Sequence, residues 1–433
     1  MSETAIVRVH GRRVWDSRGR PTVEAEVVLA DGASGRAIAP AGASRGSHEA
    51  VDLRDGGERL GGLDVGRAVA HVRGEIAFAL AGLDARDQAA VDAALIALDG
   101  TPNKSRLGGN ACIAVSLAVL HAAAAAHGEP LWRHLAAGAP VTLPMPEIQI
   151  FGGGAHAGRR VDVQDFMVMP VGATSFAAAL EMTAAVYAAA GELMRDAGKL
   201  AGVADEGGWW PMFATNEEAL DWLLRAIERA GYVPGEEVAI SLDIAASEFG
   251  REGRYRLGLE GRELDSDALA AMLLGWIERY PIVSIEDPLA EDDAAGLAKF
   301  TRAVGGRVQI IGDDFLVTNA ERVHAAVARG ACNAVLVKPN QAGTVTETRA
   351  ALAAGRAAGW GTIVSARSGE TEDVSIAHLA VGWNAGQLKV GSFARSERMA
   401  KWNEVLRIEE SLGAGAVFAG LGGLPRGVAL RRR

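Results

Sequence analysis

Six apolar runs between Ala239 and Ser392, each of which ends in or runs into a polar residue, constrain the fold of this chain more than any other feature. Roughly 25 to 30 residues of Ala-rich, helix-patterned sequence separate the later runs, which is the length of one strand plus one helix in a parallel barrel. That spacing places the ends of all six runs at one mouth of a barrel. The runs are AISLD ending at Asp243, IVSIE at Glu286, QIIGD at Asp313, AVLVK at Lys338, TIVSA before Arg367, and QLKV with Lys389.

The charged residues at these strand ends predict an active site. A charge at the end of a buried strand is costly unless it meets a metal, a partner or a substrate. Taken alone, each acid is more often a solvated loop charge or a helix cap. Three carboxylates at successive strand ends, Asp243, Glu286 and Asp313, reverse that preference, and carboxylate oxygens are the ligands that Mg2+ prefers. We therefore expect a Mg2+ site with Lys338 and Lys389 beside it.

The chain is long enough for a second unit. A barrel of this kind takes about 250 residues, whereas the chain has 433. We expect an N-terminal α+β domain over residues 1–138 and a barrel over 139–433, divided where Pro and Gly concentrate around Gly138–Pro146. Alternating polarity that gives way to helical periodicity predicts a three-stranded antiparallel meander followed by helices. The expected strands are 5–14, 22–30 and 34–40, and the expected helices are 65–82, 85–98 and 108–128.

The second unit is expected to begin irregularly. Two apolar runs, Pro146–Phe151 and Val163–Met169, precede two helical stretches near 174–197 and 215–231, and regular strand–helix alternation starts only afterwards. A loop, VADEGGWWPMF, joins the two helical stretches. A final helix is expected from about Glu397 to Leu412, followed by a tail whose Arg431–Arg433 is expected to be frayed.

Composition favours a soluble cytoplasmic protein. The net charge of −10 argues against general nucleic-acid binding. Cys112 and Cys332 lie in apolar runs and are expected to be reduced core thiols. The N-terminus lacks the apolar core of a signal peptide, and Ala-rich segments such as His121–His127 are too short to cross a membrane. The expected partner is a small molecule, with no nucleic acid and no membrane.

Nine motifs resemble segments of the enolase family, in that family's order and over nearly the whole chain. They are DSRGRPTVE, LGGNACIAVSLA, DEGG, SLDIAASEF, SIEDP, GDD, VLVKPNQAGT, RSGETED and ARSER. Each motif alone is weak, but nine in register exclude chance. The resemblance implies an N-terminal lid domain on a barrel of ββαα(βα)6 order, a homodimer or higher homo-oligomer, and two Mg2+ ions per active site, the second arriving with substrate. It also implies a hydro-lyase acting on a small anionic phosphoglycerate-like substrate.

The chemistry of such a reaction assigns roles to three residues. Removing a proton α to a carboxylate creates a dianion that needs divalent cations on its oxygens. Lys338 is the predicted general base, because a neighbouring cation and a metal disfavour its ammonium form and lower its pKa. Lys389 is that neighbouring cation, and the resemblance adds binding of the substrate carboxylate. Glu206, in a glycine-flanked loop, is the predicted general acid for the departing 3-hydroxyl.

The resemblance implies roles for further residues. Arg367 and Ser368 match phosphate-binding residues, and a guanidinium suits phosphate geometry. Ser44, in the loop Pro40–Ala50 that is expected to be mobile, matches a ligand of the second Mg2+. The remaining matches are catalytic positions at His156 and Asp165, of which His156 lies near the phosphate side, and a polar substrate contact at Gln164.

Several positions depart from the enolase pattern, and they bear on the substrate. Ala366 stands where enolases have His, and Arg45 where they have Thr, which leaves more room and adds a forked cation on the phosphate side. The preferred hypothesis is therefore a synthase of carboxyphosphonoenolpyruvate in phosphinothricin-type antibiotic biosynthesis, with Arg45 holding an extra carboxylate on the substrate. The other departures are Ala41 for Ser, Gly152–Gly154 for Asn-Gly-Gly, Asp165 for Glu, and Trp209–Met212 for Tyr-Ala-Pro-Asn.

Two alternatives stay open at this stage. One is a housekeeping enolase that converts 2-phosphoglycerate to phosphoenolpyruvate in glycolysis. The other is a non-catalytic scaffold, for which Arg159–Arg160 and Trp209–Trp210 would supply a partner surface. Such pairs are more often a solvated loop and a packed lid.

Overall fold

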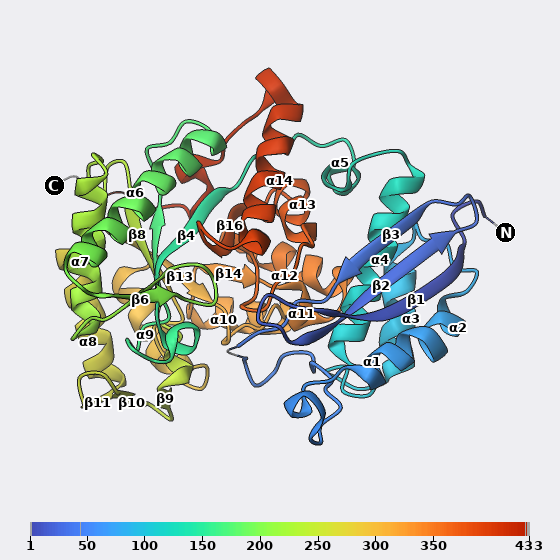
Figure 1. Cartoon of the computed structure of the whole chain (residues 1–433), viewed down its shortest axis with the longest axis horizontal. Helices are drawn as coiled ribbons and strands as arrows, with labels where there is room; N and C mark the ends of the chain where they lie inside the picture. The colour runs from blue at the N-terminus through green and yellow to red at the C-terminus, as the bar shows by residue number, and fades with distance from the viewer. Residues whose placement is uncertain (1, 44, 429, 431–433) are drawn as a thin grey trace.

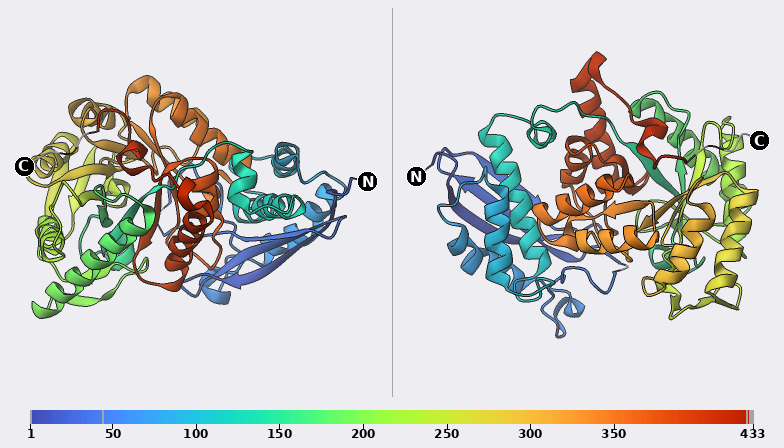
Figure 2. Two further views of the ribbon diagram at one scale, coloured as in Figure 1. Left: turned by 90° about the horizontal axis from the view of Figure 1, so that it is seen from above. Right: turned by 180° about the vertical axis from the view of Figure 1, so that it is seen from behind.

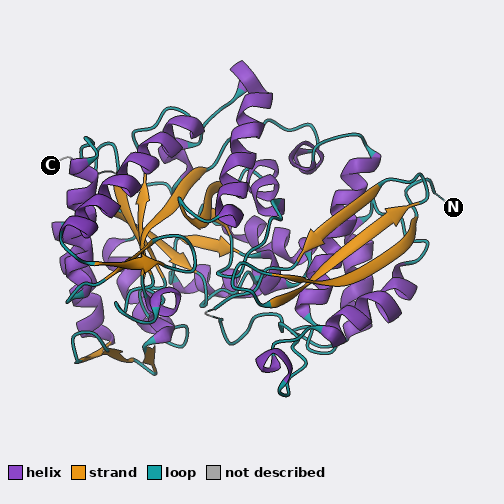
Figure 3. Cartoon of the chain, in the orientation of Figure 1, coloured by secondary structure: helices purple, strands orange, loops and turns teal. Residues whose placement is uncertain are grey.

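A computed structural model describes residues 2–43, 45–428 and 430. Ser44 and the tail Arg431–Arg433, both the subject of predictions above, lie outside the described residues. A three-stranded sheet backed by helices stands beside a barrel of strands surrounded by helices (Figures 1 and 3). One hydrophobic cluster runs through both parts, from Ile6 to Ile408. The division into residues 1–138 and 139–433 stays a prediction.

The N-terminal sheet confirms the predicted meander. Its strands pair antiparallel in the order β1-β2-β3, and they are β1 (Ile6–Trp15), β2 (Pro21–Leu29) and β3 (Ser34–Ile38). Helix α4 (Gly109–Ala126) packs across β2 and β3. A Cβ on Gly35 would lie 2.2 Å from the backbone of α4, so this close approach requires glycine. Within the described residues, α4 alone is long and apolar enough to cross a membrane, but most of it is buried in this interface.

The other N-terminal helices follow the predicted ranges with local differences. The stretch expected as one helix over 65–82 contains a π-helical turn in its middle. The helix expected from residue 85 begins at Gln88, because the Asp87 carboxylate caps it by accepting the Ala90 N–H at 3.0 Å. A short helix after Pro130 was not predicted. These elements are η1 (Arg59–Gly62), α1 (Gly66–His71), η2 (Val72–Ile76), α2 (Ala77–Leu80), α3 (Gln88–Asp99) and α5 (Leu131–Ala136).

The barrel confirms the predicted strand order. Strands β8, β12, β13, β14, β15 and β16 pair parallel in that order, β16 closes the barrel by pairing parallel with β4, and β5 pairs antiparallel with both β4 and β8. The strands are β4 (Met145–Gly152), β5 (Asp165–Met169), β8 (Ala239–Asp243), β12 (Ile282–Glu286), β13 (Gln309–Gly312), β14 (Ala334–Val337), β15 (Gly361–Ser365) and β16 (Gly386–Ser392). The polar ends of the six apolar runs therefore meet at one mouth.

Helices cover the outside of the barrel (Figure 2). Most of them begin at a capping side chain, as at Ser175 for α6 and Thr344 for α12. The helices are α6 (Phe176–Asp196), α7 (Asn216–Arg229), α8 (Ser266–Arg279), α9 (Ala294–Val304), α10 (Ala320–Arg329), α11 (Pro339–Ala342), α12 (Val345–Ala357), α13 (Ser375–Gly382) and α14 (Ser396–Leu412). Four short 3-10 turns complete them: η3 (Gly154–Ala157), η4 (Ala246–Glu248), η5 (Gly413–Gly415) and η6 (Gly420–Gly423).

Two small strand groups were not predicted. Part of the loop expected between α6 and α7 forms a hairpin that pairs with β4, and Trp209 in it stacks on Tyr187 with ring centroids 4.6 Å apart. The Trp209 indole also donates to the Tyr187 carbonyl at 2.8 Å. Trp209 is thus largely packed against α6. The strands are β6 (Leu200–Val203) and β7 (Trp209–Pro211), and on the surface β9 (Gly250–Arg251), β10 (Arg254–Leu257) and β11 (Arg262–Asp265).

Candidate active site

A cavity at the barrel mouth gathers most of the predicted site residues. Nine of them line it, and they come from strands, turns and loops far apart in the sequence. The cavity is lined by His156, Gln164, Asp165, Glu206, Asp243, Lys338, Ser365, Ala366, Arg367, Ser368, Lys389, Val390 and Gly391. Glu286 and Asp313 adjoin it through hydrogen bonds to the two lysines.

Lys389 lies at the centre of a carboxylate cluster. Its ammonium donates to Asp243 Oδ2 and to Glu286 Oε2, both at 2.8 Å, and lies 3.5 Å from Asp165 Oδ2. Burial disfavours its charged form, but the charges of Asp243 and Glu286 outweigh this and hold the pKa of Lys389 well above its usual value. Burial, and then the charge of Asp243, raise the pKa of Glu286 well above its usual value. The surroundings therefore favour the ammonium form of Lys389 and the protonated form of Glu286.

Lys338, the predicted base, pairs with Asp313. Its Nζ donates to Asp313 Oδ2, and Gln341 Nε2 donates to Asp313 Oδ1 at 2.9 Å. Burial disfavours the ammonium form, but the nearby carboxylates, Asp313 first and then Glu286, together raise the pKa of Lys338. The lowered pKa expected from the sequence concerns a lysine beside a second cation and a bound metal, and it stays a prediction for that state. The charge of Asp313 acts more strongly on the pKa of Lys338 than either of the neighbouring cations Arg367 and Lys389 does.

The carboxylates at this mouth fit Mg2+. Asp243, Glu286 and Asp313 offer only hard oxygen ligands, which suit that ion. Glu286 Oε1 is buried and has no hydrogen-bond partner among the described residues, so one lone-pair-bearing atom is available for a cation. Gln164 Oε1, in the cavity wall, is buried and unpartnered in the same sense. The residues present therefore match the predicted metal.

Asp287 is a supporting residue that sequence reasoning missed. Its backbone has a φ of 39°, a value in the left-handed region that is uncommon for a non-glycine residue. Its two carboxylate oxygens accept the backbone N–H groups of Asp313 and Asp314 at 2.9 and 2.7 Å. Asp287 therefore fixes the backbone that presents Asp313. Its position directly after Glu286 in the SIEDP motif is the only sequence signal for this role.

Glu49 is a second missed residue, and it belongs to the N-terminal loop. Its carboxylate accepts from the Arg367 guanidinium at 2.9 and 3.1 Å, and both side chains are buried. It also accepts from Gln341 Nε2 at 3.3 Å. Glu49 thus connects the predicted phosphate-binding arginine to the partner of Asp313. The available signal is that Glu49 is the only acid in the loop Pro40–Ala50.

The same loop lies against the predicted phosphate-binding residues. The Ala43 N–H donates to Ser368 Oγ at 3.2 Å, and Ala41 pairs with Gly369 in an isolated bridge. Arg45 is exposed and is not among the residues that line the cavity. Ala366 does line it. Of the two departures that suggested a larger substrate, one therefore lies in the cavity wall and the other on the loop surface.

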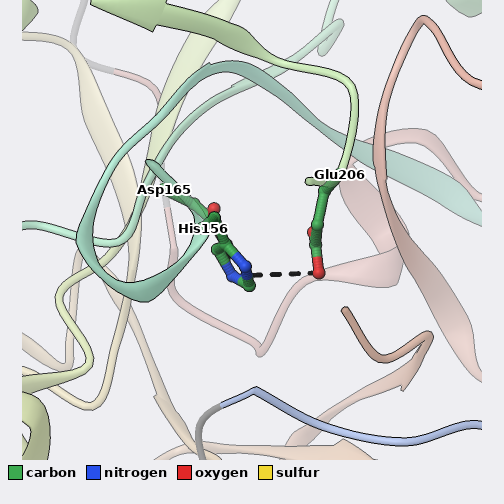
Figure 4. A group of neighbouring side chains, drawn as sticks. All are labelled: His156, Asp165 and Glu206. Atoms are coloured by element: carbon green, nitrogen blue, oxygen red, sulfur yellow. Dashed lines mark ion pairs between the residues drawn. The ribbon is translucent and has the colours of Figure 1, made fainter. Parts of the chain in front are cut away.

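His156, Asp165 and Glu206 form a group on one side of the cavity (Figure 4). His156 Nε2 lies 3.8 Å from Glu206 Oε1 and 4.0 Å from Asp165 Oδ1. Gln149 Nε2 donates to the same Asp165 oxygen. Burial raises the pKa of Asp165 to about 6. Burial also acts against ionisation of Glu206, but the surrounding cationic groups, His156 first and then Arg398 and the two lysines, together lower the pKa of Glu206.

The turn that carries Glu206 is anchored to the end of β16. The Ser392 N–H donates to the Glu206 carbonyl at 2.9 Å. Gly207 follows with a φ of 96°, and a Cβ there would lie 2.4 Å from the Ala394 carbonyl oxygen. This left-handed, crowded position requires glycine. The glycine flank noted in the sequence therefore fixes the approach of Glu206 to the cavity.

Comparison with known proteins shows the family to which the chain belongs. The family model "Enolase, N-terminal domain" matches residues 6–135, and "Enolase, C-terminal TIM barrel domain" matches residues 140–424. The chain belongs to the enolase family. A similar curated protein is Enolase 1 of Desulfitobacterium hafniense (strain Y51), which is 50% identical over 420 residues, covering 96% of each chain. The chain is accordingly a hydro-lyase of this family.

Proposed function

We propose that the chain catalyses the Mg2+-dependent dehydration of 2-phosphoglycerate to phosphoenolpyruvate. The observation that carries this proposal is one cavity that holds a lysine base candidate, a carboxylate acid candidate and an anion-binding arginine together: Lys338, Glu206 and Arg367. The 50% identity to a protein named Enolase 1 supports the same substrate.

In this mechanism Lys338 takes the α-proton from the substrate. It needs its neutral form to do so, although Asp313 favours the ammonium form. Any positive charge that offsets Asp313 favours loss of that proton. Asp243, Glu286 and Asp313 would hold Mg2+, which supplies, when bound, the positive charge that makes the α-proton acidic. We propose Ser44 as the ligand of a second ion.

Loss of the 3-hydroxyl completes the reaction. Glu206 donates a proton to the departing oxygen, and His156 and Asp165 surround that carboxyl. The cationic groups around it lower the pKa of Glu206, and the negative charge of a bound substrate acts in the opposite direction. Lys389 binds the substrate carboxylate.

The substrate phosphate takes a separate set of groups. Arg367 and Ser368 bind it, and Gln164 supplies a further polar contact. Glu49 orients Arg367 for this task, because its two carboxylate oxygens hold both guanidinium nitrogens Nη1 and Nη2.

A carboxyphosphono analogue of 2-phosphoglycerate is the second candidate substrate. The observation in its favour is that Ala366, beside Arg367, forms part of the cavity wall, so a small side chain leaves room on the phosphate side. Arg45 would have to move from its exposed position to bind an extra carboxylate. The product would be carboxyphosphonoenolpyruvate, for use in phosphinothricin-type antibiotic biosynthesis. We further propose a homodimer or higher homo-oligomer in the cytoplasm.

Steady-state dehydration, followed by absorbance with Mg2+ present, tests both substrates under the same conditions. Faster turnover of 2-phosphoglycerate supports the first proposal, and faster turnover of the analogue replaces it with the second. Ala366→His with Arg45→Thr should shift preference toward 2-phosphoglycerate. An unchanged preference would show that these positions do not select the substrate. Absence of α-proton exchange on both substrates with Mg2+ bound would favour a non-catalytic scaffold.

A further inference from the structure

Helix α14 packs against strand β16 and turns two cationic side chains into the protein interior (Figure 1). Arg398, Lys401 and Trp402 lie on one face of the helix, because residues three and four positions apart are neighbours there, and all three are fully buried. Arginine and lysine are almost never fully buried unless they are paired. The hydrogen bonds of Arg398 therefore indicate what this face of the helix does.

Arg398 holds three carbonyl groups at the cavity wall. Its Nη1 donates to the Arg367 carbonyl at 2.6 Å and to the Val390 carbonyl at 3.0 Å, and its Nη2 donates to the Ser368 carbonyl. These three residues line the barrel-mouth cavity, whereas Arg398 does not. Arg398 therefore supports the phosphate side of the cavity from behind its wall.

The positive charge of Arg398 has no hydrogen-bonded carboxylate among the described residues. Glu397 Oε1 lies 3.5 Å from Arg398 Nε, but both atoms are buried and lack a hydrogen-bond partner in the described part of the chain. A buried charge is costly unless a hydrogen-bonded group of opposite charge compensates it, and a guanidinium stays charged when buried. An anion in the neighbouring cavity would offset this charge.

The charge of Arg398 acts inside the cavity, as its effect on Glu206 indicates. Burial disfavours the ionised form of Glu206, and among the charges that lower its pKa Arg398 comes directly after His156. Gly391 permits this close packing, because a Cβ there would lie 3.0 Å from Glu206 Cβ and 3.1 Å from Arg398 Cδ. Arg398 and Glu206 thus meet at the same part of the cavity wall.

The hydrogen bonds of Arg398 also fix the orientation of two peptide groups. In a planar trans peptide the C=O and the N–H that follows it point in opposite directions. Because Arg398 holds the Arg367 carbonyl, the Ser368 N–H points away from Arg398, and it has no acceptor among the residues that the structure describes. Beyond the Ser368 carbonyl, the Gly369 N–H donates to the Ala41 carbonyl at 2.9 Å. One of the two N–H groups is therefore available to a ligand.

We propose that Arg398 is a positioning residue for anion binding at Arg367 and Ser368: it turns the Ser368 N–H toward the cavity and places a buried positive charge behind the bound anion. The identification of that anion as the substrate phosphate rests on the proposed function. The effect of Arg398 on anion binding can be measured without turnover.

Inorganic phosphate titrated into Mg2+-saturated protein, followed by phosphorus NMR, tests this role. Arg398→Lys keeps the charge but not the planar fork, and it should weaken phosphate binding about 10-fold, as expected for the loss of one hydrogen bond. Arg398→Met also removes the charge and should weaken binding further. Circular dichroism checks that each variant folds.

The matched control is Arg54→Lys. Arg54 Nη1 also holds two carbonyls, those of Pro21 at 2.6 Å and Leu63 at 2.8 Å, but Arg54 lies away from the cavity. This variant loses a comparable fork without changing the cavity wall, so it should bind phosphate as the wild type does.

Amide hydrogen exchange of the wild-type protein gives a second measurement that needs no variant to fold. Phosphate should slow exchange of the Ser368 N–H in proportion to the fraction of protein bound. The Gly369 N–H already donates to Ala41 and should not respond. Unchanged exchange at Ser368 with phosphate bound would overturn the proposed orientation of this peptide.

Steady-state kinetics separates positioning from general support of the fold. In Arg398→Lys the KM for 2-phosphoglycerate should rise about 10-fold while kcat changes little, because the phosphate is held alike in the ground and transition states. A lower kcat with unchanged KM, or equal phosphate affinity in the wild type and both Arg398 variants, would overturn the inference. Arg398-dependent phosphate binding by a protein that dehydrates neither candidate substrate would leave the inference standing and refute the proposed function.

Discussion

Replacing Glu286 by Gln should remove Mg2+ binding while leaving the metal-free protein about as stable as before. Glu286 contributes one carboxylate to the proposed Mg2+ set, and Gln keeps its shape without its charge. In the metal-free protein Lys389 loses one charge-assisted hydrogen bond to Glu286 but retains Asp243 at 2.8 Å and Asp165 at 3.5 Å. That loss is at most about 1.5 to 3 kcal/mol. Relief of the repulsion between Glu286 and Asp243, which raises the pKa of Glu286, acts in the opposite direction.

The size of the Mg2+ effect can be worked out in advance. An ion present at 100 times its Kd stabilises the folded protein by about 2.7 kcal/mol. Unfolding entropy of about 2.1 cal/mol/K per residue gives about 0.9 kcal/mol/K for 433 residues. The wild-type Tm should therefore rise by about 3 °C when Mg2+ is added at that level, and Glu286→Gln should show no rise.

Differential scanning calorimetry in chelator and in stepwise Mg2+ measures both quantities. The control is Glu248→Gln, because Glu248 is an acid outside the ligand set that pairs with Arg159 at 2.8 Å. This control should keep the full Mg2+-dependent shift. An equal rise in Tm for Glu286→Gln would refute the assignment of Glu286 as a metal ligand.

Three further predictions address catalysis, pH and packing. Lys338→Met should slow exchange of the substrate α-proton in D2O by a factor of about 10² to 10⁴. Glu206→Gln should keep that proton exchange but lose dehydration. The opposite result for the two variants would mean that Glu206 is the base and Lys338 the acid. Burial lowers the pKa of His378 to about 4, compared with about 6.5 in the unfolded chain. Between these values the unfolded chain binds a proton that the folded protein does not, so the stability that His378 contributes is complete above pH 6.5 and is lost as pH falls toward 4. Urea unfolding should show that this contribution decreases by about 2.5 kcal/mol between pH 7.5 and 4.5, and His378→Gln should remove that part; an identical pH dependence in the variant would contradict it. Gly191→Ala puts a Cβ 2.5 Å from the Trp209 side chain and should lower the free energy of unfolding by about 1 to 3 kcal/mol. The measurement is a lower Tm. An unchanged Tm would mean that the indole moves away without cost.

The barrel could be predicted from sequence because its strands carry a strong local signal. Buried runs such as Ala239–Asp243 and Ile282–Glu286 are mostly apolar, with one serine each, up to a charged end, and parallel pairing places those ends together. The hairpin β6–β7 gave no such signal. Its strands are very short, and Trp209 is held by stacking on Tyr187 of the preceding helix α6. Tertiary contacts of that kind do not appear in local periodicity.

The candidate site, too, could be predicted from the sequence only in part. Residues at strand ends, such as Lys338, could be placed from the sequence, but the charge partners that set their protonation could not. Asp313 raises the pKa of Lys338, whereas the sequence argument considered only a neighbouring cation and a metal, which act in the opposite direction. Glu49 pairs with Arg367 across more than three hundred residues of sequence, and no spacing rule connects them. Long-range ion pairs depend on the packing of the whole fold.

Closure of the barrel has a consequence for how the chain is made. Strand β4 near residue 150 completes the ring only by pairing with β16 near residue 390. During synthesis the partly built barrel therefore has two open edges until β16 leaves the ribosome, and unpaired strand edges promote association with other chains. Nascent chains that end before Gly386 should be bound by chaperones, and release should coincide with the emergence of β16.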